Sequence, residues 1–287
     1  MTATVRELWR YPVKSMQGER VPELEFGAAG AAGDRAWAVR DEQRGGIRGA
    51  KKIPELMRCA AAYAETPAPG PSRPAHIRLP DGALIATGDE EVHQRLSEAL
   101  GTPVSLWPLL PADAVDHYRR GAPTHEDLET ELRAMFGRDE GEPLPDLSKL
   151  PPELFEFESP PGTYFDALPV LVMTTASLAR LEATAPDSLF DVRRFRPNVL
   201  VETGDPPGFP EDAWIGRRLR LGEVELAVET ACPRCVMTTH PFAELPKDPA
   251  VMRALVREHG GDLGVYCRVL QPGRVREGAA VHVTPGA

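Results

Sequence analysis

Two cysteines lie three residues apart in the segment from Ala231 to Pro241, with an arginine between them and two threonines behind them. Cys232 and Cys235 are soft ligands, Arg234 is a fixed cation, and the threonines carry hydroxyl groups. Thiolates suit a soft metal, and a guanidinium favours an anionic ligand through charge-assisted hydrogen bonds. The segment therefore indicates a site for a soft metal with an anionic carrier. Redox chemistry of the two thiols is the other interpretation of this spacing.

Basic and hydroxyl side chains near the N-terminus stand at the ends of strand patterns. Lys14 and Ser15 follow an apolar strand pattern that runs from Val5 to Tyr11, and Arg35 lies in a turn just before a second strand pattern. Loops at strand ends commonly carry function. Isolated lysines and arginines are more often only solvated surface charges, so these residues are candidates for anion contacts and no more.

A second group of candidates stands around two strand patterns in the last third of the chain. Arg193, Arg194 and Arg196 come just before the strand pattern Val199 to Glu202, and Arg196 and Asn198 should face the same side because they are two residues apart. The strand pattern Pro169 to Met173 leads to a threonine pair that begins a helix. The N–H groups at a helix start suit an anion, although a plain capping role for the threonine is commoner.

The bulk composition limits the class of function. The chain has 287 residues, of which 42% are hydrophobic and 26% charged, which is ordinary for a globular protein of one or two domains. Its net charge of -10 argues against nucleic acid as the main partner. Four cysteines are too few for a disulfide scaffold. The first residues lack a signal-peptide layout, and no apolar run approaches a membrane span, so we expect a cytoplasmic protein without membrane attachment.

Strand patterns dominate two of the three segments into which the chain divides. Residues 1–110 contain a hairpin turned by Asp81-Gly82 and a helix that ends at Gly101. Residues 163–287 contain a helix that starts near Asp248 and a final segment, 273–283, that reads as another hairpin. Many strands and few short helices predict a mainly β fold with short helices (α+β), built as an antiparallel barrel or a barrel-like sheet.

The central segment, residues 111–162, differs in composition from the rest of the chain. It is crowded with charges and prolines, and its one clear helix pattern is expected to be capped by Thr124. We expect an insertion, a linker or a lid over a site. His117 and His125 are possible catalytic groups, although lone histidines in such a segment are more often structural or solvated.

The chain resembles the molybdenum cofactor sulfurase C-terminal (MOSC) family. It is most similar to the branch with an N-terminal β-barrel domain, which includes the mitochondrial amidoxime reducing component and its bacterial relatives. The motifs that carry the resemblance occur in the family's order and span nearly the whole chain outside the central segment: Tyr11-Pro12-Val13-Lys14-Ser15, Gly33-Asp34-Arg35-Ala36-Trp37, Arg194-Phe195-Arg196-Pro197-Asn198, Cys232-Pro233-Arg234-Cys235 with Thr238-Thr239, and Gly264-Val265-Tyr266.

The resemblance implies a MOSC-type β-barrel plus a smaller N-terminal β-barrel-like domain, and a bound molybdenum–molybdopterin cofactor. Cys235 matches the family's metal ligand and is the expected catalytic residue, and Arg234 beside it is expected to favour its thiolate over a thiol of reference pKa about 8.5. The positions that correspond to cofactor contacts are Lys14, Ser15, Arg35, Thr175, Ser177, Arg196, Asn198, Arg234 and Tyr266.

The activity implied is molybdenum-dependent oxidoreductase chemistry, the reduction of small N-hydroxylated compounds or N- and S-oxides by oxygen-atom transfer. Because the chain lacks a ferredoxin-like cysteine set, we expect a separate electron-donor protein. Two alternatives stay open: a sulfur carrier or sulfurtransferase that uses a Cys235 persulfide, and a non-enzymatic molybdenum cofactor binding protein. A zinc site at Cys232 and Cys235 is disfavoured, because no second CxxC or histidine pair stands at metal spacing. A thioredoxin-like redox pair is disfavoured, because the sequence lacks the helix start and the βαβ pattern that it requires.

Overall fold

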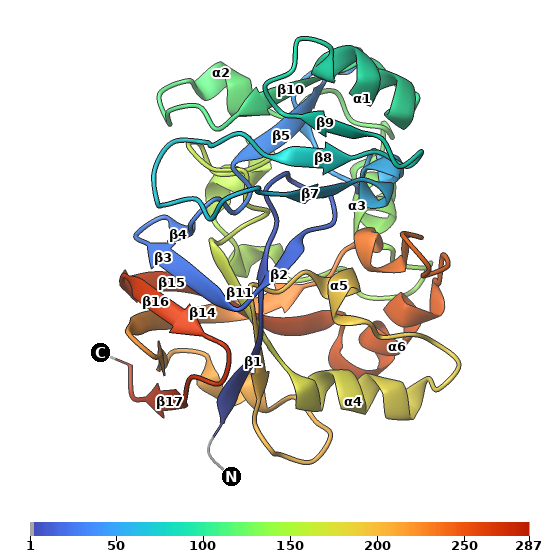
Figure 1. The fold of residues 1–287 in the computed structure, drawn as a ribbon. Helices are drawn as coiled ribbons and strands as arrows, with labels where there is room; N and C mark the ends of the chain where they lie inside the picture. Colours follow the sequence, from blue (N-terminus) through green and yellow to red (C-terminus); the bar gives the residue numbers. More distant parts are fainter. Residues whose placement is uncertain (1–2, 287) are drawn as a thin grey trace.

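The computed structural model describes residues 3–286, which form a mainly β fold with short helices, as predicted (Figure 1). One sheet of eight strands has the order β17-β13-β14-β15-β11-β12-β1-β2. Its pairs are antiparallel except β11 and β12, which run parallel, so the expectation of a purely antiparallel sheet is wrong at this one pair. The strands are β1 (Thr4–Arg10), β2 (Glu19–Val21), β11 (Val170–Thr174), β12 (Val199–Glu202), β13 (Arg218–Leu221), β14 (Val224–Pro233), β15 (Asp262–Gln271) and β17 (Val281–Thr284).

Three small sheets of three strands each complete the β structure. The hairpin predicted around Asp81-Gly82 is present, because β8 and β9 pair antiparallel across this turn. The three sheets consist of β3 (Glu23–Gly27), β4 (Gly30–Ala31) and β16 (Gly273–Arg276); β5 (Trp37–Asp41), β6 (Ile47–Arg48) and β10 (Val104–Pro108); and β7 (Ala60–Ala62), β8 (His76–Arg78) and β9 (Leu84–Ala86).

The last two strands do not pair with each other, so the hairpin expected over residues 273–283 is wrong. β16 pairs with β3, and β17 pairs with β13. In the same way, β1 and β2 join the large sheet beside β12. The expected division at residue 110 therefore does not coincide with a division between sheets. Alternating apolar residues identify a strand, but they do not specify its partner.

Helices cover one side of the large sheet and part of the N-terminal half. Apolar residues of α4 (Thr175–Thr184) and α6 (Ala250–His259) share a core cluster with β11 and β12, and the other sheet face carries a second core. In α1 (Val92–Leu100), Val92, Leu96 and Leu100 are buried and Gly101 ends the helix in the left-handed region, as predicted. The short remaining helices of these parts are η1 (Pro54–Arg58), α5 (Val192–Phe195), η4 (Pro210–Trp214) and η5 (Val236–Thr239).

The central segment is folded, and its elements are α2 (Val115–Tyr118), α3 (Leu128–Phe136), η2 (Leu147–Lys149) and η3 (Pro152–Phe155). The cap of α3 is Asp127, whose carboxylate accepts a 2.7 Å hydrogen bond from the Thr130 N–H, so the expectation that Thr124 caps this helix is wrong. The Thr124 N–H instead reaches the Glu131 carboxylate. Within residues 3–286, every helix falls short of the length and apolar character that a membrane span requires.

Candidate functional site

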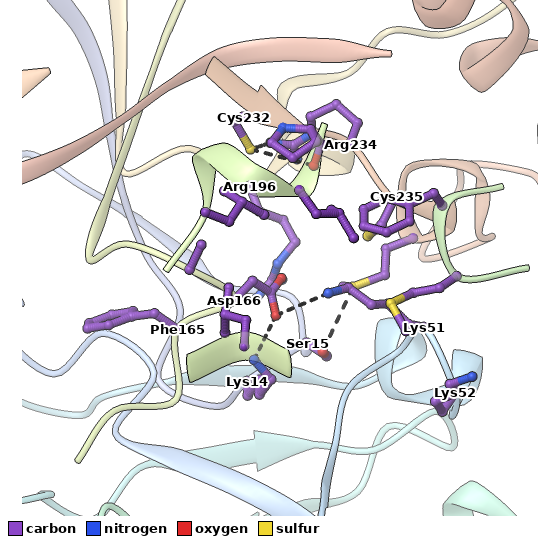
Figure 2. Close-up of a pocket in the computed structure, with 18 of the residues that line it drawn as sticks. Lys14, Ser15, Lys51, Lys52, Phe165, Asp166, Arg196, Cys232, Arg234 and Cys235 are labelled. Atoms are coloured by element: carbon purple, nitrogen blue, oxygen red, sulfur yellow. Dashed lines mark hydrogen bonds and ion pairs between the residues drawn. The ribbon is translucent and has the colours of Figure 1, made fainter. Parts of the chain in front are cut away.

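A cavity of about 440 Å³ lies where the N-terminal loops, the central segment and the end of β14 meet. Figure 2 shows Cys232, Arg234 and Cys235 on one side of it, facing Lys14, Ser15 and Asp166 on the other. Eight of the ten candidate residues from the sequence line this cavity: Lys14, Ser15, Arg35, Arg196, Asn198, Arg234, Cys235 and Tyr266. Thr175 and Ser177 are not among its lining residues.

The polar part of the cavity wall is strongly basic. Nine lysine and arginine side chains line the cavity against two carboxylates, those of Glu131 and Asp166. The whole chain carries a net charge of -10, so the cations are concentrated at this one place. The wall therefore has the electrostatic character of an anion site. Its nine cations are Lys14, Arg35, Arg48, Lys51, Lys52, Arg120, Arg194, Arg196 and Arg234.

Cys232 and Cys235 both line the cavity, and Cys235 is the more exposed of the two. It stands just after β14, where the chain leaves the sheet and turns into the 3₁₀ helix Val236–Thr239. Of the cysteines in residues 3–286, Cys235 alone is half-buried, and the others are buried. The guanidinium of Arg194 fixes the segment behind it through hydrogen bonds to the Thr238 and His240 carbonyls at 3.2 and 3.1 Å.

Arg234 makes its direct side-chain contact with the neighbouring cysteine, Cys232. Its guanidinium donates a 2.9 Å hydrogen bond to Cys232 Sγ and a second to the Phe195 carbonyl. Burial raises the pKa of the Cys232 thiol, although Arg234 opposes this shift. The direct contact of Arg234 is thus with Cys232, a buried thiol, and its expected effect on the Cys235 thiolate stays a prediction.

Asp166 joins two lysines on the cavity floor. Lys14 Nζ donates to Asp166 Oδ1 at 2.7 Å and to the Tyr164 carbonyl at 2.9 Å, and Lys51 Nζ lies 3.7 Å from the same carboxylate oxygen (Figure 2). Burial opposes ionisation of Asp166, but the two ammonium groups outweigh it and hold its pKa well below the usual range. Burial lowers the pKa of Lys14, against the attraction of Asp166.

Two arginines lie together on the ring of Tyr11. The guanidinium carbons of Arg35 and Arg196 are 4.7 and 4.2 Å from the centre of this ring. Arg35 pairs with Asp34 at its other end. Burial and the neighbouring Arg35 lower the pKa of Arg196 to about 10. Two buried cations held this close favour an anion in the cavity beside them.

The backbone at three lining residues is in the left-handed region. Ser15, Arg35 and Arg196 have φ of 69°, 47° and 58°, and among residues 3–286 the only other non-glycine residue with positive φ is Ala243. Each such residue costs about 1–2 kcal/mol relative to the right-handed form. Strain gathered at one cavity is typical of a functional site, where the surrounding structure holds side chains in fixed directions.

Asn198 and Ser15 have structural bonds as well as a place on the cavity wall. Asn198 Oδ1 accepts from the Leu171 N–H at 3.1 Å, and its amide nitrogen donates to Asp34 Oδ2 at 3.0 Å. Ser15 Oγ accepts from the Ala50 N–H at 2.9 Å. Asn198 thus ties the strands behind the arginines together, and Ser15 ties the loop of Lys51 to the loop of Lys14.

Ser177 is held inside the fold. The hydroxyl of Thr174, not Thr175, caps α4 by accepting from the Ser177 N–H at 3.2 Å. Ser177 Oγ donates to the buried Glu211 carboxylate, which also accepts from Thr174 Oγ1 at 2.8 Å. The commoner capping role is therefore the one that the structure supports at this helix start.

The two histidines of the central segment are not in the cavity lining. His117 is buried and lies 2.7 Å from the Tyr164 hydroxyl, within a small aromatic cluster. His125 is exposed, and its backbone N–H donates to Glu131. Neither histidine is among the residues that line the cavity with Cys235, and a catalytic role for either stays a prediction.

Sequence reasoning missed several lining residues, including Lys51, Lys52 and Asp166. The first two stand in a glycine- and lysine-rich stretch, residues 45–52. Its basic residues were the available signal. Asp166 gave no local signal, because a single aspartate near a strand has no distinctive neighbours in the sequence.

Comparisons with known proteins assign two domains to this chain. The MOSC N-terminal beta barrel domain matches residues 2–101, and the MOSC domain matches residues 161–282. Mitochondrial amidoxime reducing component 2 of Homo sapiens is 29% identical over 252 residues, and that of Bos taurus is 30% identical over 253 residues. Both alignments cover 82% of this chain and 66% of the relative.

Among solved structures, the YUAD protein from Bacillus subtilis aligns with 100% of this chain and 98% of its own, at 14% identity and a TM-score of 0.45. The chain spans about two thirds, 66%, of the length of the amidoxime reducing components that it matches. The two domain matches leave residues 102–160 between them unassigned, and this range includes most of the central segment. The protein belongs to the MOSC family, in the branch with an N-terminal β-barrel domain.

Proposed function

We propose that the protein is a molybdenum-dependent oxidoreductase that reduces small N-hydroxylated compounds in the cavity beside Cys235. MOSC domains are associated with molybdenum cofactor binding, and the matched relatives are amidoxime reducing components. The observation that carries the proposal is the position of Cys235. A half-buried thiol faces a cavity lined by nine cations in a chain of net charge -10.

The residues present fit a phosphorylated pterin with a soft metal. The cations outnumber the carboxylates on the wall, and burial and the neighbouring Arg35 lower the pKa of Arg196. The buried Nε atoms of Arg48 and Arg234 have no hydrogen-bond partner among the described residues. Cys235 would hold the metal, and Lys14, Arg35, Arg196 and Arg234 would hold the anionic groups of the carrier.

In the proposed reaction the N–O bond of an amidoxime breaks, and the substrate takes up two electrons and two protons. The hydroxyl oxygen leaves as water, and the product is an amidine. When bound, the cofactor supplies the two-electron centre for this reaction. A separate electron-donor protein supplies the electrons. Lys51 holds a proton at Nζ on the cavity floor, because Asp166 and Cys235 outweigh burial and raise its pKa. Lys14 and Arg196 orient the anionic groups.

The test is the molybdenum and pterin content of the purified protein, compared between wild type, Cys235→Ala and the matched control Cys59→Ala. Cys59 is buried in the N-terminal core, away from the cavity lining. We expect about one molybdenum per chain and amidoxime reduction in wild type and control, and loss of both in Cys235→Ala. Full molybdenum content and activity in Cys235→Ala would overturn the proposal. Labile sulfane sulfur without molybdenum would instead support a persulfide carrier on Cys235.

A further inference from the structure

The cavity has a second wall, which is apolar and comes from the central segment. The described chain exposes ten large hydrophobic side chains, and the two most exposed, Leu128 and Phe155, are each 71% exposed and both line this cavity. Monomeric proteins seldom leave large apolar side chains gathered around one site without a ligand or partner for them. The other apolar lining residues of this segment are Leu132, Met135, Phe136, Leu147, Leu150 and Leu154.

We propose that this wall is a subsite for the apolar tail of the substrate, so that the preferred substrates carry a small N-hydroxylated head on an extended alkyl or aryl group. The inference rests on the proposed function, and it names the substrate class for the same cavity. The wall and Cys235 line one continuous cavity, so a substrate whose head group lies beside Cys235 can reach the wall with its tail.

Helix α3 presents its apolar stripe to the cavity rather than to the core. Leu128, Leu132 and Met135 recur at helical spacing, yet the buried residues of α3 are Glu131 and Phe136. An amphipathic helix normally buries such a stripe against the protein. Here the stripe is left as cavity surface, which is the arrangement that a ligand-binding wall requires.

The rest of the protein holds α3 in this orientation. Glu131 pairs with Lys52 and accepts from the His125 N–H at 3.0 Å, and Arg253 donates to the Gly137 carbonyl at the end of the helix. Gly137 itself packs closely against Val236, the residue after Cys235. The apolar stripe is therefore fixed relative to Cys235, as a specificity surface must be.

The two walls together select an amphiphilic ligand. The basic floor around Lys14, Lys51 and Arg196 accommodates the anionic carrier and repels a cationic substrate tail. The apolar wall offers few polar partners, so a polar tail would lose water without replacing its hydrogen bonds. A neutral head group on an apolar tail is the substrate that satisfies both walls.

The expected size of the effect follows from burial of methylene groups. Each buried methylene contributes about 0.8 kcal/mol, which lowers the dissociation constant about fourfold. Binding of neutral straight-chain alkyl amidoximes should therefore tighten about fourfold per methylene until the wall is covered. The holoprotein without reductant measures this binding by calorimetry, independently of turnover.

The test variant is Leu128→Gln on the wall, and the matched control is Leu84→Gln on β9. Leu84 is also an exposed leucine, at 60%, but it does not line the cavity. We expect Leu128→Gln, alone or with Phe155→Gln, to weaken binding of the longest amidoxime about tenfold and to leave the shortest one unchanged. Leu84→Gln should match wild type. Both positions are exposed, so both variants should fold.

An affinity for amidoximes that is independent of their chain length, or equal in Leu128→Gln and Leu84→Gln, would overturn the subsite.

A second experiment follows turnover with a chemical reductant, which removes the electron-donor protein from the assay. Chain-length-dependent binding without reduction of any amidoxime supports the subsite and contradicts the proposed function. Reduction of short and long amidoximes with equal KM supports the function and contradicts the subsite.

Discussion

Replacement of Asp166 by asparagine tests the electrostatic design of the cavity floor. The carboxylate is the common partner of Lys14 and Lys51, at 2.7 and 3.7 Å. Asparagine keeps the shape and removes the charge. The two ammonium groups then face each other without a counter-ion, so we expect Asp166→Asn to destabilise the cofactor-free protein and to strengthen its binding of inorganic phosphate.

The magnitude follows from the two distances. Even with the dielectric constant of water, about 80, the attractions to Lys14 and Lys51 are about 1.5 and about 1 kcal/mol. Removing one member of a buried pair costs about 3–5 kcal/mol, but the Asp166 side chain is 40% exposed to the cavity, and solvent screening lowers this figure. We expect a loss of about 2 kcal/mol in the free energy of unfolding, or about 5 °C in melting temperature.

The pH dependence has a definite sign. Because the folded-state pKa of Asp166 is depressed, its contribution to stability is complete above the unfolded pKa of about 3.9 and is lost as the pH falls through the folded value. Wild type and Asp166→Asn should thus differ fully near neutral pH and converge only in strong acid. Urea unfolding of the cofactor-free protein at several pH values measures this.

The matched control is Glu55→Gln, which removes one carboxylate from an exposed pair with Arg58. It should stay within about 0.5 kcal/mol of wild type. Phosphate should bind Asp166→Asn about tenfold more tightly than wild type and restore part of its lost stability, because the anion takes the place of the carboxylate. Unchanged stability together with unchanged phosphate affinity in Asp166→Asn would refute the electrostatic reasoning.

Two further predictions concern the thiols and the backbone of the site. In the native cofactor-free protein, only one thiol per chain, that of Cys235, should react quickly with a thiol reagent. The buried cysteines should react only after unfolding. A second fast-reacting thiol would contradict the burial pattern. Arg196 has φ of 58°, so Arg196→Gly should be more stable than Arg196→Ala by about 1 kcal/mol in the free energy of unfolding, measured in urea. Both variants should bind phosphate more weakly than wild type. Equal stability of the two variants would exclude backbone strain at this position.

Local signals in the sequence were sufficient for most elements and for most of the site. The α1 stripe and its glycine stop, the hairpin at Asp81-Gly82 and the strand at Val199–Glu202 depend on nearby residues, and the structure has them where they were expected. The motifs that resembled the MOSC family named eight residues that line the cavity. Such motifs can be identified from the sequence because each is a short run of unusual residue types.

Contacts between residues distant in the chain could not be predicted from the sequence. β16 and β17 looked like a hairpin, yet each pairs with a strand elsewhere, because the alternation of apolar residues is the same for any partner. The hydrogen bond from Arg234 to Cys232 was not foreseen either, since sequence spacing does not fix the direction of a long side chain.

The sequence by itself determined the fold class, the family and the thiol at the centre of the site, because these follow from local patterns and short motifs. Tertiary structure alone decided that Asp166 links Lys14 to Lys51, and that the central segment turns the stripe of α3 toward the cavity. These contacts join segments more than a hundred residues apart. Their free energy depends on distance in space, and the order of residues along the chain does not specify it.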